Sequence, residues 1–191
     1  LGISKNGYRK KYSRPTPDKP VFRPKKHDHP PELWVQKAET FLKSAQASLW
    51  TPEGQAARNI LFGKGLTEET IRRAGIGFNP VEFYRDRQGW GLTRDVRSDG
   101  KPKRLWIPAG LVIPLCHDEG LARLRVRRSD PGEGPRYVIV VGSSLAPMIL
   151  APEKNVFIVV ESELDAWLCR QEAGDLAGVM AIGSAGLKPD Q

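Results

Sequence analysis

The feature that most limits the possible folds is a pair of short apolar segments near the end of the chain. Residues 156–160 form an unbroken apolar run, which is typical of a strand covered on both faces. Residues 162–173 have the pattern of a helix, and residues 178–182 form a second apolar run. Two strands joined by a helix form a β-α-β unit, in which the strands are parallel. We therefore expect an α/β fold.

Glu161 stands at the junction between the first of these strands and the helix. Ligands of open α/β sheets bind beyond the carboxyl ends of the strands, and a carboxylate there can bind a hard cation such as Mg²⁺. Asp165 lies one helical turn further on and is expected on the same face. Acidic residues in a first helical turn are also favoured by the helix macrodipole, which accounts for Glu163 and Asp165. It does not account for Glu161, which is the stronger candidate for a metal ligand.

Upstream of the β-α-β unit, the pattern changes from helices to short strands. Apolar residues repeat at helical spacing over 35–49, 56–61 and 67–74, and Thr51 and Thr67 are expected to cap the second and third helices. Short apolar segments separated by turn residues follow, and their close spacing favours antiparallel pairing. These predicted strands are 90–93, 104–107, 111–115, 121–126, 137–141 and 148–150. An α+β arrangement is therefore expected before the β-α-β unit.

Positive charge is concentrated at the start of the chain. Residues 1–26 hold nine Lys and Arg and one Asp, which equals the whole formal net charge of +8. Residues 1–31 also contain six of the 16 prolines, so we expect a basic linker that does not fold alone. Such a run either contacts nucleic acid or serves as a solubilising tail. No segment has the apolar length of a membrane span, and two cysteines are too few for a disulfide scaffold, so a cytoplasmic setting is expected.

A second basic region lies in the middle of the chain, where residues 85–136 carry a net charge of +5. Within it, Arg123, Arg125 and Arg127 alternate with apolar residues and are expected to share one face of a strand. Like charges along one face repel, and a polyanion would relieve this repulsion. An ordinary solvated face with nearby acids as partners would give the same pattern. Trp106 is a candidate for stacking on a nucleic-acid base.

Three stretches of the chain resemble bacterial DnaG-type DNA primases. Residues 60–78 contain ILFGKGLT and IRRAGIGF, and they resemble the segment that opens the N-terminal subdomain of the family's RNA-polymerase core. Residues 110–137 contain GLVIPL, the basic strand and the sequence PRY, and they resemble the family's basic strand pair and proline-lysine-tyrosine step. Residues 159–189 resemble the first half of a Toprim domain, a fold shared with topoisomerases. Together the resemblance covers residues 56–191.

The resemblance implies a DNA primase that joins ribonucleoside triphosphates into RNA primers on single-stranded DNA. It implies Glu161 and Asp165 as catalytic residues, with Glu161 as a ligand of Mg²⁺ or Mn²⁺. It further implies that basic side chains of the matched segments hold template or nucleotide phosphates. These side chains are Lys64, Arg123, Arg125, Arg127, Arg128 and Arg136.

The chain also departs from the family pattern. Ser162 stands where glycine is usual, Lys64 replaces an arginine, and Arg136 replaces a lysine. The later Asp-x-Asp pair of Toprim domains does not occur before Gln191, and residues 1–191 do not include the family's zinc-binding domain, so we expect a middle piece of a longer primase. We therefore expect an incomplete metal site, and no polymerase activity from this chain alone.

Three parts are expected along the chain. They are a basic proline-rich linker over 1–31, the N-terminal subdomain of a primase core over 32–152, and the truncated start of a Toprim domain over 153–191. Two other functions remain open, namely a non-catalytic module that binds single-stranded DNA and a Toprim nuclease or topoisomerase-like protein. The resemblance also leaves open a replicative helicase as partner and a mobile-element primase or primase–helicase as source.

Overall fold

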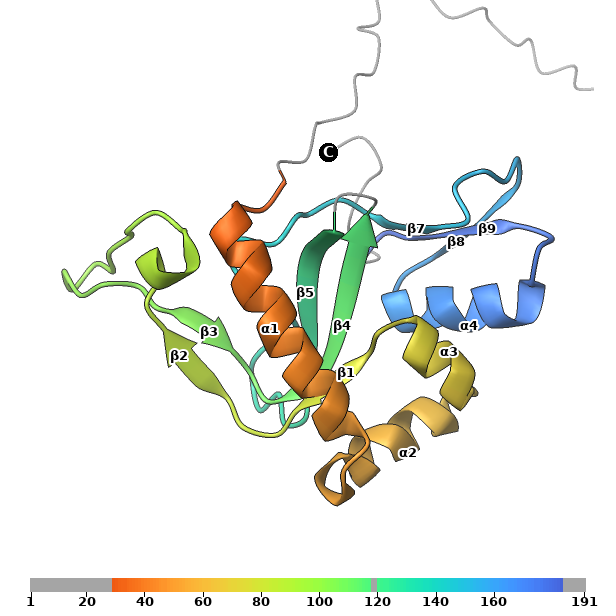
Figure 1. Ribbon diagram of the computed structural model, residues 1–191, viewed down its shortest axis with the longest axis horizontal. Helices are drawn as coiled ribbons and strands as arrows, with labels where there is room; N and C mark the ends of the chain where they lie inside the picture. Colours follow the sequence, from red (N-terminus) through yellow and green to blue (C-terminus); the bar gives the residue numbers. More distant parts are fainter. Residues whose placement is uncertain (1–28, 118–119, 184–191) are drawn as a thin grey trace, which may run out of the picture.

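The structure, a computed structural model, describes residues 29–117 and 120–183. All but the last three residues of the predicted basic linker lie outside these ranges, as do residues 184–191 of the predicted Toprim segment. The described part contains three sheets and four α-helices (Figure 1). No helix in that part is both long and apolar enough to cross a membrane.

Helix α1 (Glu32–Leu49) crosses the front of the largest sheet (Figure 1). Its buried side chains recur every three or four residues, which places them on one face of the helix. They are Trp34, Ala38, Leu42, Ala45 and Leu49. The helix predicted over 35–49 is therefore confirmed, and its apolar stripe packs on the sheet.

The two predicted threonine caps have different outcomes. Thr67 caps helix α3 (Glu68–Arg73), because its side chain accepts a hydrogen bond from the backbone N–H of Thr70. The cap predicted at Thr51 is wrong, because the Thr51 hydroxyl instead donates to the carbonyl of Ser48 at 2.8 Å. The chain there forms a short 3₁₀ turn, η1 (Pro52–Gly54), and helix α2 (Gln55–Gly63) follows it.

The largest sheet is antiparallel and has the strand order β1-β4-β5-β6. Its strands are β1 (Gly77–Asn79), β4 (Gly110–His117), β5 (Gly120–Arg128) and β6 (Tyr137–Ile139). Three of these were predicted from sequence. Strand β1 was not, because Phe78 is its one apolar side chain.

A second, two-stranded sheet pairs β2 (Phe83–Arg85) with β3 (Leu105–Ile107). The strand predicted over 90–93 is wrong, because a 3₁₀ turn, η2 (Gln88–Trp90), leads into Gly91 with a left-handed φ of 72°. Trp90 is buried there against Trp34, with ring centroids 6.4 Å apart. The apolar ring of Trp90 made this turn resemble a strand in the sequence.

The third sheet has the order β7-β9-β8. It consists of β7 (Met148–Leu150), β8 (Phe157–Val160) and β9 (Gly178–Ala181), with helix α4 (Glu163–Ala173) joining β8 to β9. Strands β8 and β9 are parallel, which confirms the predicted β-α-β unit. Strand β7 pairs antiparallel with β9, so this sheet includes a strand that precedes residue 153.

Strand β8 differs from the sequence prediction in its burial. Val159 is 61% exposed and Phe157 and Ile158 are each 37% exposed, although the unbroken apolar run predicted cover on both faces. Within the described residues β8 is the edge strand of its sheet. The prediction of full cover is therefore wrong for this part of the chain.

Helix α4 connects the third sheet to the rest of the fold. Leu164 is fully buried in the cluster formed by α2, α3 and β4. Ala166 is fully buried in a different cluster, together with Val179 of β9 and Ala122 of β5. The helix thus packs against both sheets and fixes where the β8–α4 junction lies relative to β5.

Candidate functional site

Glu161 lies between the end of β8 and the start of α4, where sequence analysis placed it. Its backbone is held, because the N–H of Gly183 donates to the Glu161 carbonyl at 2.9 Å and the N–H of Ile182 donates to the Val160 carbonyl at 3.1 Å. Its side chain is exposed and makes no hydrogen bond or ion pair in the structure's described ranges. An ordered backbone and an unengaged carboxylate are the properties expected of a residue that binds a ligand.

Asp165, one turn further on, is fully engaged. Its Oδ2 accepts a 2.6 Å hydrogen bond from the Ser162 hydroxyl, and its Oδ1 forms a 3.0 Å ion pair with Lys64 Nζ. Burial acts to raise the pKa of Asp165, but the hydrogen bonds from Ser162 and Lys64 outweigh it and hold that pKa below its usual value. Ser162 also caps α4, since its side chain accepts from the Asp165 N–H. Asp165 therefore ties the start of α4 to the end of α2.

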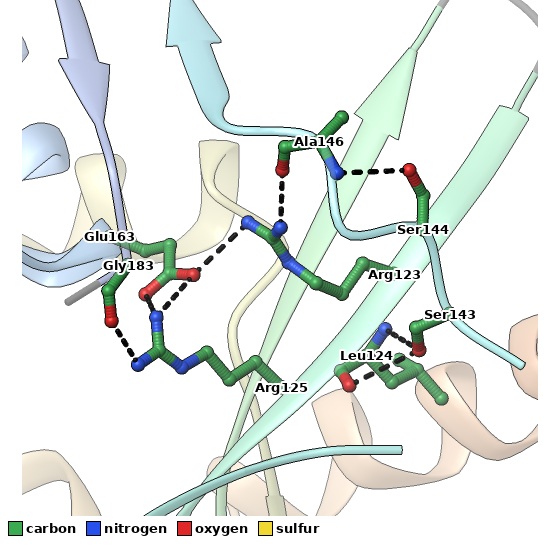
Figure 2. A network of polar contacts seen from close by, with 8 residues as sticks. All are labelled: Arg123, Leu124, Arg125, Ser143, Ser144, Ala146, Glu163 and Gly183. Carbon is green, nitrogen blue, oxygen red and sulfur yellow. Dashed lines mark hydrogen bonds and ion pairs between the residues drawn. The ribbon is translucent and has the colours of Figure 1, made fainter. Parts of the chain in front are cut away.

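A buried ion triad lies next to this junction (Figure 2). The Glu163 carboxylate, 1% exposed, accepts from Arg123 Nη2 at 3.0 Å and from Arg125 Nη1 at 2.8 and 2.7 Å. Arg123 also donates to the carbonyl of Ala146, and Arg125 donates to the carbonyl of Gly183 at 2.8 Å. Burial lowers the pKa of Arg123 and the Glu163 charge opposes this, so the guanidinium remains charged.

The triad corrects the expectation of an open arginine face on β5. Arg123 and Arg125 do share one face of the strand, but they are only 4% and 8% exposed. The start of α4 covers that face, and Glu163 supplies the negative charge that we expected from a polyanion. These two arginines therefore do not contact phosphates in the described arrangement.

The other predicted phosphate-binding residues also fall into two groups. Lys64 is paired with Asp165, as described above. Arg127, Arg128 and Arg136 have no carboxylate partner within the described residues. Arg128 Nη1 donates to the carbonyl of Pro131 at 2.7 Å, and Arg136 is exposed. The structure thus leaves these three as basic groups that an anion could neutralise.

Two aromatic rings of the β2–β3 sheet and two arginines, one of them at the end of β5, form a partly exposed row. Tyr84 faces Trp106 across the strands, with ring centroids 6.3 Å apart and planes 13° from parallel. The guanidinium of Arg104 lies 5.8 Å from the Tyr84 ring, and that of Arg128 lies 5.5 Å from the Trp106 ring. Tyr84 is 44% exposed. We call these four residues the aromatic row.

Two members of the aromatic row, Trp106 and Arg128, were named from the sequence, whereas Tyr84 and Arg104 were not. Tyr84 was missed because β2 ends on Arg85 and forms no apolar run, and the ring that Tyr84 faces lies on a strand 22 positions later. Arg104 and Trp106 are two positions apart, so in a strand their side chains lie on the same face. This spacing could have indicated the basic and aromatic face of β3.

The acidic side chains at the β8–α4 junction provide only part of a metal site. Nowhere in residues 29–117 and 120–183 do three or more His, Cys, Asp or Glu side chains gather closely enough to bind a metal. Glu161 offers a hard oxygen ligand of the kind Mg²⁺ prefers, whereas both oxygens of Asp165 are occupied. The oxygen ligands at this junction suit a divalent cation, and Glu161 supplies one free carboxylate for it.

Comparison with known proteins agrees with this arrangement. No family model matches the chain. It is 29% identical over 164 residues to the DNA primase of Pseudomonas aeruginosa, a match that covers 81% of this chain. It superposes on the DnaG primase catalytic domain solved with single-stranded DNA with a TM-score of 0.57, at 19% identity, over 78% of this chain and 55% of that chain. The chain is thus similar in sequence to a DNA primase and in fold to DnaG primase catalytic domains.

Other primase structures support the same fold. The DNA primase domain from Pseudomonas aeruginosa matches with a TM-score of 0.56 at 20% identity, over 80% of this chain and 55% of that chain. The RNA polymerase domain of Mycobacterium tuberculosis DnaG matches with a TM-score of 0.58 at 16% identity, over 84% and 57%. The chain corresponds to 23% of the curated Pseudomonas primase. It therefore has the fold of part of a DnaG primase core.

Proposed function

We propose that this chain is part of the catalytic core of a DNA primase, which in the intact protein makes RNA primers on single-stranded DNA. The observation that carries the proposal is the position of Glu161. Its unengaged carboxylate lies at the carboxyl end of a parallel strand, beside a sheet with the primase-core fold. Ligands of α/β sheets bind at such strand ends.

In this proposal Glu161 holds a divalent cation, Mg²⁺ or Mn²⁺. Such ions activate the attacking hydroxyl and stabilise the leaving pyrophosphate in nucleotidyl transfer. Asp165 and Lys64 keep the start of α4 in place through their 3.0 Å ion pair. We assign Asp165 a supporting role, because its two oxygens are already bonded to Lys64 and Ser162.

We further propose that the template strand contacts the aromatic row and the free arginines near it. Tyr84 and Trp106 offer ring faces on which bases of any sequence can stack. Arg104, Arg127 and Arg136 have no acidic partner among the described residues and are suited to contact phosphates, which gives affinity rather than sequence preference. A non-catalytic module that binds single-stranded DNA would use the same surface.

Primer synthesis by the intact protein tests the catalytic role of Glu161. We expect Glu161→Gln to abolish synthesis with Mg²⁺ and with Mn²⁺, because Gln keeps the shape but loses the negative charge. Glu153→Gln is the matched control, since Glu153 is another exposed acid and its nearest ion-pair partner, Lys154, is 3.8 Å away. Synthesis at the parental rate by Glu161→Gln would refute the role proposed for this carboxylate.

Binding of single-stranded DNA tests the second part of the proposal. We expect Tyr84→Leu together with Trp106→Leu to weaken binding about tenfold or more, since stacking on an aromatic side chain contributes about 1–3 kcal/mol per base. We expect Arg104→Gln to reduce the dependence of affinity on salt concentration, because one phosphate contact is lost. Arg73→Gln, at the exposed end of α3, serves as a charge-matched control. Unchanged affinity in the aromatic variant would show that DNA binds elsewhere.

These two experiments separate the proposed function from its alternative. A primase core loses synthesis in Glu161→Gln and keeps DNA binding. A non-catalytic DNA-binding module shows no synthesis in the parent protein, and its affinity depends on the aromatic row alone.

A further inference from the structure

The loop after β9 bonds to Glu161 and also to a side chain from another sheet. The N–H of Gly183 donates to the carbonyl of Glu161 at 2.9 Å, and the carbonyl of Gly183 accepts from Arg125 Nη2 at 2.8 Å. Arg125 Nη1 meanwhile holds both oxygens of Glu163, two residues after Glu161. One guanidinium of β5 therefore reaches both chain segments that border the free carboxylate (Figure 2).

The surroundings of Arg125 fix the plane and charge of its guanidinium. The ring of Tyr137 lies 4.7 Å from its central carbon, and the side chain is 8% exposed. A planar fork of donors can bond two groups in different directions at once, whereas a lysine ammonium is a compact point charge. The geometry therefore requires arginine in particular, and charge alone does not satisfy it.

Arg123 provides an internal comparison. It bonds the same Glu163 oxygen as Arg125, at 3.0 Å, and it is equally buried. Its other nitrogen donates to the carbonyl of Ala146, in the segment before β7, and makes no contact with Gly183 or Glu161 among the described residues. The two arginines share a role in burying the Glu163 charge, but only Arg125 reaches the loop that holds Glu161.

We infer that Arg125 is a positioning residue for Glu161. It holds Glu163 on one side of the carboxylate and Gly183 on the other, and so fixes the direction in which Glu161 leaves the sheet. This inference rests on the proposed function, in which Glu161 binds a divalent cation. Groups that orient a metal ligand commonly change metal affinity or activity about 10- to 100-fold when they are removed.

The test compares Arg125→Lys with Arg123→Lys in two measurements. In the 191-residue chain, amide hydrogen exchange at Gly183 reports the hydrogen bond to Glu161 directly and needs neither metal nor substrate. In the intact protein, steady-state primer synthesis gives kcat and the KM for nucleotide. We expect Arg125→Lys to speed exchange at Gly183 about tenfold or more and to lower kcat at least tenfold with KM nearly unchanged. We expect Arg123→Lys to leave both close to the parental values.

A triple variant separates positioning from stability. Replacing Arg123, Arg125 and Glu163 together by Met leaves no unpaired buried charge, and substitutions of this kind are often neutral or stabilising. We expect the triple variant to fold, to lose the slow exchange at Gly183 and to have a reduced kcat. Slow exchange and parental kcat in either the triple variant or Arg125→Lys would overturn the inference.

The outcomes also separate this inference from the proposed function. If Glu161→Gln abolishes synthesis while Arg125→Lys behaves like Arg123→Lys, the positioning role fails and the proposed function stands. If Glu161→Gln keeps the parental rate, the proposed role of Glu161 fails, and with it the reaction for which Arg125 would position that residue.

Discussion

Glu163→Gln tests the energetic importance of the buried triad. The substitution removes one negative charge and places an amide NH₂ group among the donors of two guanidinium groups. Arg123 and Arg125 are 4% and 8% exposed, so water does not replace the lost partner. Removing one partner of a buried ion pair costs about 3–5 kcal/mol, and two arginines depend on this carboxylate. We therefore expect a loss at the upper end of that range.

A loss of this size is easy to measure. A domain of about 150–250 residues shifts its melting temperature by about 2–4 °C per kcal/mol, so a loss of about 5 kcal/mol in Glu163→Gln should lower it by about 10–20 °C. Urea unfolding followed by circular dichroism should show a lower midpoint with an unchanged slope, because the surface exposed on unfolding stays the same.

Glu161→Gln is the matched control for this experiment. It makes the same chemical change two residues earlier, at an exposed side chain with no ion pair in the described part of the chain. We expect it to change stability by less than about 0.5 kcal/mol, as is usual for surface substitutions. If Glu163→Gln also stays within about 1 kcal/mol of the parent, the buried triad does not contribute as its geometry indicates.

Two further predictions concern pH and backbone conformation. Ser162 and Lys64 hold the pKa of Asp165 below its unfolded value. The ion pair of Asp165 therefore stabilises the fold above about pH 4, and this stabilisation is lost as the pH falls through the lowered pKa. Asp165→Asn should accordingly melt at a lower temperature than the parent at pH 7 and at the same temperature near pH 2. A difference in melting temperature that stays constant with pH would contradict this. Gly142→Ala should destabilise the fold by clearly more than Gly100→Ala. Both glycines have a positive φ, so both substitutions strain the backbone. Only the methyl group added at Gly142 would meet the Trp34 ring, at 2.6 Å. Equal urea midpoints for the two variants would count against the close packing described around Trp34.

The parts of the fold that sequence predicted are those with a long or unbroken apolar pattern. Helix α1 was predicted from a helical period, and β8 and β9 were predicted from unbroken apolar runs. The three-residue strands β3 and β7 were predicted because all of their residues are apolar. The equally short strands β1 and β2 were missed because they include Gly77, Asn79 and Arg85, and their pairing is set by contacts with strands far along the chain. Local pattern thus determined element type, whereas strand partners came from tertiary packing.

The candidate site also shows that a local sequence pattern does not reveal which residues meet in the folded chain. The alternation in β5 correctly placed Arg123 and Arg125 on one face, because strand period depends only on backbone geometry. It gave no information about what covers that face. Glu163 was interpreted only as an acidic residue in a first helical turn, and nothing local shows that it lies under two arginines from a strand 38 and 40 positions earlier.

That separation along the chain has a consequence for how the protein is synthesised. The ribosome adds about 5–20 residues per second, so about 2–8 s pass between the synthesis of Arg123 and that of Glu163, 40 positions later. A sheet that forms before α4 has been made would present two charged, hydrated arginines on the face that α4 later covers. Hydrated charges on an unfinished sheet discourage contact with other nascent chains, as inward-pointing charges do on edge strands. The residues that join the two sheets in the folded protein are thus also expected to protect the first sheet until its partner has been made.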